Sequence, residues 1–141
     1  MPRQDDFLRH LAEVPLFSAL SKKELGLVAR RAEDVKVEPG RVLVTEGSTG
    51  SEFFVILDGQ AKVSRHGRKV ATLGPGAAFG ELALLDRAPR NATVTAETPM
   101  ELVVLGQREF GGIIDEVPGF ARKLLAGMAR RLREADAHSV Q

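Results

Sequence analysis

The sequence predicts a mainly β domain with helices at both ends, and three observations lead to that fold class. The apolar residues recur with a helical period over the first 31 residues and again after Gln107. Between these regions lie short β-rich runs, each bounded by Gly, Pro, Asp or Ser. Many short strands at close spacing favour a barrel or sandwich over a parallel α/β sheet.

The N-terminal region is expected to form two short helices. Val14 precedes Pro15, and a residue before proline is biased away from the α conformation, so a break is expected there. Ser21 and Glu24 have the spacing of a capping box, which predicts the start of the second helix. The apolar stripe of this helix contains Leu25, Val28 and Ala29.

The β region begins at about Glu33, where the period changes to two and valines alternate with charged residues through Val37. The further β-rich runs are 42–45, 52–57, 60–65, 69–73, 92–96 and 101–105. Asp58-Gly59 separates two of these runs and predicts a two-residue hairpin, because a type I′ turn needs positive φ at both positions.

The C-terminal region is predicted to be an amphipathic helix. Its apolar face contains Phe120, Leu124, Leu125, Met128 and Leu132. The basic residues Arg122, Lys123, Arg130, Arg131 and Arg133 fall elsewhere and are interpreted as a solvated face. A helix of about 20 residues is about 30 Å long, enough to cross the open end of a small barrel.

Composition excludes several classes of function. Twenty Lys and Arg against 19 Asp and Glu leave a net charge of +1, so no global field attracts nucleic acid or an anionic membrane. The absence of cysteine excludes disulfides and thiolate nucleophiles. His10, His66 and His138 are scattered, so neither a metal nor another cofactor is expected. Without a signal peptide or an apolar run of membrane-spanning length, the expected location is cytoplasmic.

The segment from Gly74 to Val94 does not read as ordinary barrel sequence. A helix start after Gly80 presents free N–H groups and a positive dipole end, which favour an anion. Arg90 adds a planar fork of donors suited to phosphate oxygens. Glu81 would repel a phosphate but can accept a hydrogen bond from a ribose hydroxyl. These groups suit a ligand with one phosphate charge and a free hydroxyl. No P-loop pattern for a triphosphate is present.

The motifs FGELALL (79–85) and PRNATV (89–94) resemble the phosphate-binding cassette of the cyclic nucleotide-binding domain. That family occurs in protein kinase A regulatory subunits, cyclic-nucleotide-gated channels and the sensor half of the bacterial catabolite activator protein. The resemblance covers residues 14 to 136. The glycine and apolar framework also matches at Pro39-Gly40, Glu46-Gly47, residues 53–56 and Asp58-Gly59. The implied fold is an eight-stranded β-roll, or jelly roll, with N-terminal helices and a C-terminal lid helix.

The resemblance also implies the roles of individual residues. Glu81 would bind the ribose 2′-OH, Arg90 the cyclic phosphate, and the backbone of Gly80, Leu82 and Ala83 would close around that phosphate. Asn91 and Ala92 complete the expected ligand-binding set. Asn91 stands where many relatives have Ala, Ser or Thr, which leaves the choice between cAMP and cGMP open. The lid residues expected to reach the base are Leu132, Ala135 and Asp136.

Together these expectations describe one domain over residues 1–141, with helices within 5–31 and a β-roll over 33–106. Its cassette spans 79–92 and its C-terminal helices lie within 107–138. The expected function is a regulatory sensor, not an enzyme, that binds a cyclic nucleotide, first of all cAMP, and moves its C-terminal helix. A homodimer or a separate effector protein is the expected partner. Neither a membrane nor direct nucleic-acid binding is expected, since no helix-turn-helix fits before Gln141.

Two alternatives stay open at this point. The first is a scaffold or dimerisation module that keeps the β-roll but no longer binds nucleotide, and docks a partner through Phe120, Leu125 and Met128. The second is an isomerase or metalloenzyme on the same fold, which the lack of clustered metal ligands disfavours.

Overall fold

The computed structural model describes residues 2–14, 17–18, 20–50, 52–80, 89–123, 125–126, 129 and 133. The helices are α1 (Pro2–Glu13), α2 (Lys22–Arg31) and α4 (Gln107–Glu116), and residues 118–123 are also helical. The strands are β1 (Glu33–Val37), β2 (Val42–Val44), β3 (Glu52–Asp58), β4 (Ala61–Arg65), β5 (Arg68–Leu73), β6 (Ala78–Phe79), β7 (Thr93–Ala96) and β8 (Met100–Gly106).

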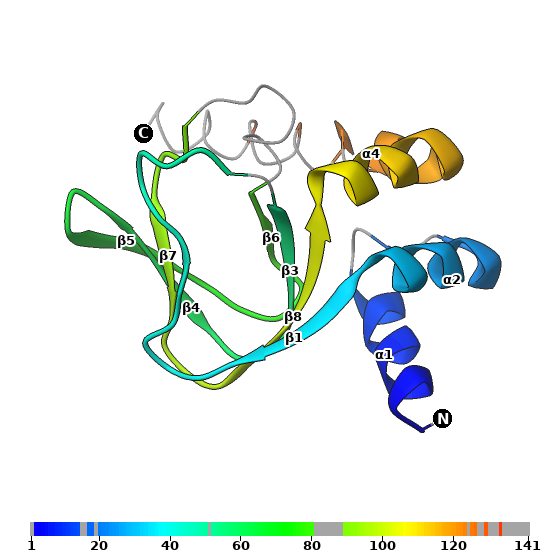
Figure 1. Cartoon of the computed structure of the whole chain (residues 1–141), viewed down its shortest axis with the longest axis horizontal. Coiled ribbons are helices and arrows are strands. Elements are labelled where there is room, and N and C mark those ends of the chain that lie inside the picture. The colour runs from blue at the N-terminus through cyan, green and yellow to red at the C-terminus, as the bar shows by residue number, and fades with distance from the viewer. Residues whose placement is uncertain are drawn as a thin grey trace.

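The strands form two four-stranded antiparallel sheets, in the orders β1-β8-β3-β6 and β2-β7-β4-β5. The two sheets face each other as a roll, and α1, α2 and α4 gather on one side of it (Figure 1). The predicted eight-stranded, mainly β fold with flanking helices is therefore confirmed.

Helix α2 begins with the predicted capping box. The Ser21 hydroxyl accepts from the Glu24 N–H at 3.1 Å, and the Glu24 carboxylate accepts from the Ser21 N–H at 2.8 Å. Leu25 and Val28 are buried, as the apolar stripe predicts, and α1 ends at Glu13, before the expected break.

Within the part of the chain that the structure describes, no helix has the length and apolar character that a membrane crossing requires.

The hairpin predicted at Asp58-Gly59 is wrong, because β3 and β4 belong to different sheets. Gly59 has φ +90°, and a Cβ there would lie 2.4 Å from the Pro99 carbonyl oxygen. Gly59 therefore lies where the chain passes from one sheet to the other and where its backbone closely approaches that of Pro99. The two-residue hairpin lies instead between β4 and β5, where His66 and Gly67 have φ values of 52° and 79°. Two adjacent residues with positive φ are what a type I′ turn requires.

Strand β6 was not predicted, since two residues between glycines are too short for a period to appear. It pairs with β3, where Phe79 lies opposite Phe54 and the two rings stack with centroids 4.8 Å apart. This pairing places the Gly80 end of the predicted cassette beside the start of β3.

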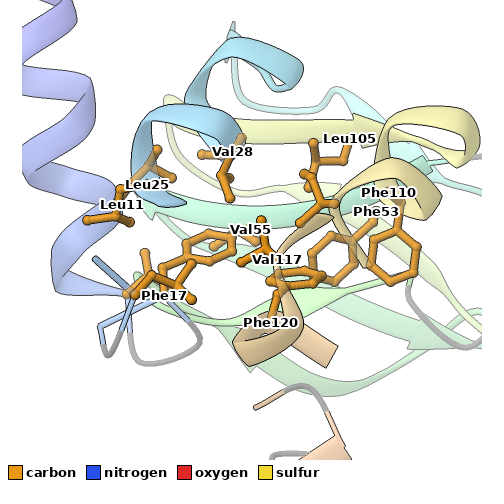
Figure 2. Close-up of a cluster of buried hydrophobic side chains, with 14 of the residues drawn as sticks. Leu11, Phe17, Leu25, Val28, Phe53, Val55, Leu105, Phe110, Val117 and Phe120 are labelled. Carbon is orange, nitrogen blue, oxygen red and sulfur yellow. The ribbon is translucent and has the colours of Figure 1, made fainter. Parts of the chain in front are cut away.

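The core has two parts, one inside the roll and one between the helices and the sheet of β3 and β8. The second part is rich in phenylalanine (Figure 2). The ring of Phe120 stacks on Phe17 at 5.8 Å and meets Phe110 edge-on at 5.8 Å, and Phe110 contacts Phe53 at 5.2 Å. Phe120 therefore joins the helical segment after α4 to the N-terminal region at Phe17 and to α4 at Phe110.

The burial of Phe120 corrects the expected docking face of the C-terminal helix. Its side chain is fully buried, whereas Leu125 is 64% exposed, so the two residues do not form one accessible apolar face. Met128, the third residue of that face, lies outside the described residues. The ring of Phe120 is inaccessible because it packs into the domain core against Phe17 and Phe110.

Candidate ligand-binding site

Arg90 is the centre of the candidate site, because it is a buried charged side chain with only 8% of its surface exposed. Its backbone is held by the chain that precedes β3. The Arg90 N–H donates to the Ser48 carbonyl at 2.8 Å, and the Gly47 N–H donates to the Arg90 carbonyl at 2.8 Å. Thr49 and Pro89 add a β-bridge beside these bonds. These backbone contacts hold Arg90 in place independently of its side chain.

The guanidinium of Arg90 is oriented by backbone carbonyls from two other segments. Its Nη1 donates to the Gly80 carbonyl at 3.0 Å, and its Nη2 donates to the Glu52 carbonyl at 2.8 Å. A guanidinium is planar and stays charged at neutral pH, so these bonds fix the plane of a permanent cation. Three segments distant in sequence thus converge on one positive group.

Two glycines leave the space that this side chain occupies. Gly80 has φ +95°, and a Cβ there would lie 2.7 Å from both the Arg90 Nη1 and the Glu52 carbonyl oxygen. A Cβ at Gly50 would lie 1.8 Å from the Arg90 Nε. The guanidinium therefore packs directly against the backbone at both glycines.

The structure brings together two of the residues predicted from the sequence, Gly80 and Arg90. Asn91 is exposed and Ala92 is buried, and both directly precede β7. The other members of the predicted set lie outside the described residues, so their roles stay predictions. They are Glu81, Leu82, Ala83, Leu132, Ala135 and Asp136.

The sequence interpretation missed Gly50 and the Glu52 carbonyl. A backbone carbonyl leaves no trace in the identity of its residue, so no sequence pattern could reveal the Glu52 contact. Gly50 was visible only as one more glycine before a predicted strand, and glycines commonly mark turns. The missing information was the pairing of residues 47–49 with 89–90.

The two histidines that the structure describes each lie beside a carboxylate. The His66 Nδ1 lies 3.5 Å from a Glu46 carboxylate oxygen, and the His10 Nδ1 lies 3.8 Å from one of Glu101. Burial raises the pKa of Glu101, and a hydrogen bond and charge repulsion from Asp34 raise it further. Over the described ranges, no group of three or more His, Cys, Asp or Glu residues has the arrangement to hold a metal ion.

Comparison with known proteins identifies the family of this chain. Residues 34–117 match the family described as "Cyclic nucleotide-binding domain", which is more than half of the chain and includes Arg90 and the sheets around it. The chain therefore belongs to the cyclic nucleotide-binding domain family.

Individual relatives are regulatory and receptor proteins. The chain is 40% identical to a cAMP-dependent protein kinase regulatory subunit of Yarrowia lipolytica, over 80% of this chain and 31% of that protein. It resembles the crystal structure of the Thermus thermophilus catabolite activator protein with a TM-score of 0.81 and 33% identity, covering 88% of this chain and 61% of the other. A co-crystal structure of the regulatory domain of Toxoplasma gondii PKA with cAMP gives a TM-score of 0.69 and 36% identity, covering 79% and 44%.

These comparisons confirm the predicted resemblance to the cyclic nucleotide-binding domain, and they confirm the predicted β-roll fold. The chain spans 24–31% of the length of the first curated kinase-subunit relatives that it matches.

Proposed function

We propose that this chain is a regulatory sensor module that binds a 3′,5′-cyclic nucleotide, with cAMP as the first candidate. The observation that carries the proposal is the buried Arg90, whose guanidinium is held by the Gly80 and Glu52 carbonyls within the family-matched residues. The cAMP in the Toxoplasma co-crystal structure supports this choice of ligand.

Arg90 suits the single charge of a cyclic phosphodiester. A guanidinium donates in a planar fork to phosphate oxygens, and charge-assisted bonds of this kind are among the strongest hydrogen bonds in proteins. Its burial strengthens the attraction because water screens the two charges less. In this proposal Glu81 binds the ribose 2′-OH, and the backbone of Gly80, Leu82 and Ala83 closes around the phosphate. Asn91 and Ala92 follow Arg90 at the edge of the same site.

The proposed module performs no chemistry on its ligand and acts by a shift of population. A ligand that binds one arrangement of the C-terminal helix better than another shifts the molecule toward that arrangement. Leu132, Ala135 and Asp136 are proposed to close over the base. A homodimer partner or a separate effector would then respond to the position of this helix.

Calorimetry and thermal unfolding with cAMP, cGMP and linear AMP test the proposal. A ligand at about one hundred times its Kd adds about 2.7 kcal/mol to the free energy of unfolding. We expect this gain with cAMP and none with linear AMP, whose phosphate is a monoester with about two negative charges and does not close a ring with the ribose. If neither cyclic nucleotide changes the unfolding temperature of the unaltered chain, the proposed function is wrong.

Variants at Arg90 then test the assigned contact. Arg90→Lys keeps a positive charge but loses the planar fork, so we expect it to weaken cAMP binding by at least about tenfold, or about 1.4 kcal/mol. The matched control is Arg108→Ala, because Arg108 is exposed in the first turn of α4. Equal affinity in Arg90→Lys and Arg108→Ala would exclude Arg90 as the phosphate ligand.

A further inference from the structure

The β4–β5 hairpin carries a concentration of positive charge that the proposed nucleotide site does not use. No Asp or Glu occurs from Gly59 to Gly80, and the same stretch contains the four cations Lys62, Arg65, Arg68 and Lys69. All four lie on β4 or β5. This hairpin is therefore strongly basic in a chain whose net charge is only +1.

An ion pair with a neighbouring segment neutralises one of these four charges. Lys69 Nζ lies 3.1 Å from a Glu97 carboxylate oxygen. Among the residues that the structure describes, no ion pair involves the side chains of Arg65 or Arg68.

The register of the hairpin places these two arginines directly opposite each other. Arg65 and Arg68 are partners at the end of the ladder, next to the His66-Gly67 turn. Directly opposed residues have Cβ atoms about 5 Å apart, and like charges at this position repel. Both side chains are exposed. A partner that brings negative charge to the tip would relieve this repulsion.

The hairpin is also accessible along its outer strand. β5 is the edge of its sheet, with five exposed residues followed by one half-buried residue. It lies at the opposite end of the roll from α1, α2 and α4 (Figure 1). A partner can therefore reach the arginine pair without displacing a helix.

The surroundings of the pair favour an acidic peptide over other anions. All seven phenylalanines are buried and the chain has no Tyr or Trp, so the hairpin offers a nucleic acid one exposed ring, the imidazole of His66, and not the row of rings on which successive bases stack. Val70, 55% exposed, is the single large apolar residue exposed on the described hairpin, too little to anchor a membrane-bound element.

We propose that the β4–β5 hairpin docks an extended acidic segment of a partner protein, whose carboxylates bind the guanidinium groups of Arg65 and Arg68. Side chains two residues apart on an extended chain lie on one face, about 6.6 Å from each other. That spacing is close enough to the arginine pair for one carboxylate to reach each guanidinium in a bidentate contact.

Fluorescence anisotropy tests the proposal with a labelled peptide of alternating Glu and Ser residues and a Lys-Ser peptide as the opposite charge. The test variant is the double substitution Arg65→Glu and Arg68→Glu, which reverses the charge but keeps a like-charged cross-strand pair. The matched control is Lys22→Glu with Lys23→Glu, the same charge change on two exposed residues of α2. Unfolding curves verify that both variants are folded.

We expect the full chain and the α2 control to bind the Glu-Ser peptide, and the hairpin variant to bind it at least tenfold more weakly. Raising the salt from about 0.01 M to about 0.1 M shortens the Debye length from about 30 Å to about 10 Å and should weaken this binding. Equal losses in both variants, or none in either, would overturn the proposal. So would tighter binding of duplex oligonucleotide or of phosphatidylserine vesicles through the same two arginines.

Discussion

Arg90 illustrates how backbone atoms of distant segments can specify a single side chain. The bonds to the Gly80 and Glu52 carbonyls orient its guanidinium, and Gly50 provides the space beside its Nε. The side chain itself could be predicted from the PRNATV motif, and Gly80 from the cassette. The roles of the Glu52 carbonyl and of Gly50 could not be predicted, because they depend on the pairing of residues far apart in sequence.

Gly50→Ala tests the packing around the guanidinium and leaves Arg90 itself unsubstituted. The added Cβ would overlap the guanidinium, which must turn away from its two carbonyl partners. We expect the affinity for cAMP to fall at least about tenfold, equal to about 1.4 kcal/mol. Titration calorimetry measures it. The control is Gly26→Ala, where a Cβ has open space around it and the affinity should not change. Unchanged affinity in both would show that the guanidinium tolerates displacement.

Glu101 gives the stability of the chain a pH dependence. Burial first, and then Asp34, raises its pKa above the ordinary 4.5, against smaller opposite effects of His10 and Lys36. The folded chain therefore binds this proton more tightly than the unfolded chain does. Its contribution to stability is present below pH 4.5 and is lost as the pH rises through the raised pKa.

We expect Glu101→Gln to reduce the fall in unfolding free energy between pH 4.5 and neutral pH. Denaturant unfolding at a series of pH values measures this slope. The control is Glu38→Gln, an exposed residue after β1, which should keep the slope of the unaltered chain. Identical slopes for both variants and the unaltered chain would contradict the assignment to Glu101.

At the scale of elements, α2 depends on its capping box for a defined start. The Ser21 hydroxyl accepts one of the N–H groups that the first helical turn leaves without a partner. Ser21→Ala should lower the free energy of unfolding by about 1 kcal/mol. Urea unfolding checks this loss, and Ser21→Thr, which keeps a hydroxyl, should recover most of it. A full-sized loss in Ser21→Thr would mean that the hydroxyl is not the stabilising group.

Elements were predictable where a local pattern was long or chemically specific. The Ser21–Glu24 box and the valine alternation of β1 are of this kind. The Asp58-Gly59 hairpin failed because a glycine signal shows a turn but does not show which strands the turn connects. β6 was missed because two residues carry no period. Strand partners are decided by tertiary packing, which a local sequence window does not contain.

For the whole molecule, the phenylalanine cluster joins the N-terminal helices, the sheet and the chain after α4 into one core. Phe120→Ala would remove the ring that contacts both Phe17 and Phe110. We expect a loss of about 3–5 kcal/mol in the free energy of unfolding, since a large buried ring leaves a cavity. Leu125→Ala, at an exposed position, should change it by about 0.5 kcal/mol or less. Similar losses from both substitutions, measured by urea unfolding, would contradict this description of the core.

The pairing of β1 with β8 has a consequence for biosynthesis. Glu33 lies opposite Val104, so the first strand finds its neighbour only after almost the whole roll has left the ribosome. Until then the apolar face of the nascent sheet stays open to chaperones and proteases, and long-range pairing of this kind slows folding. A pause in translation shortly before β8 would therefore prolong the period in which the new chain is most vulnerable.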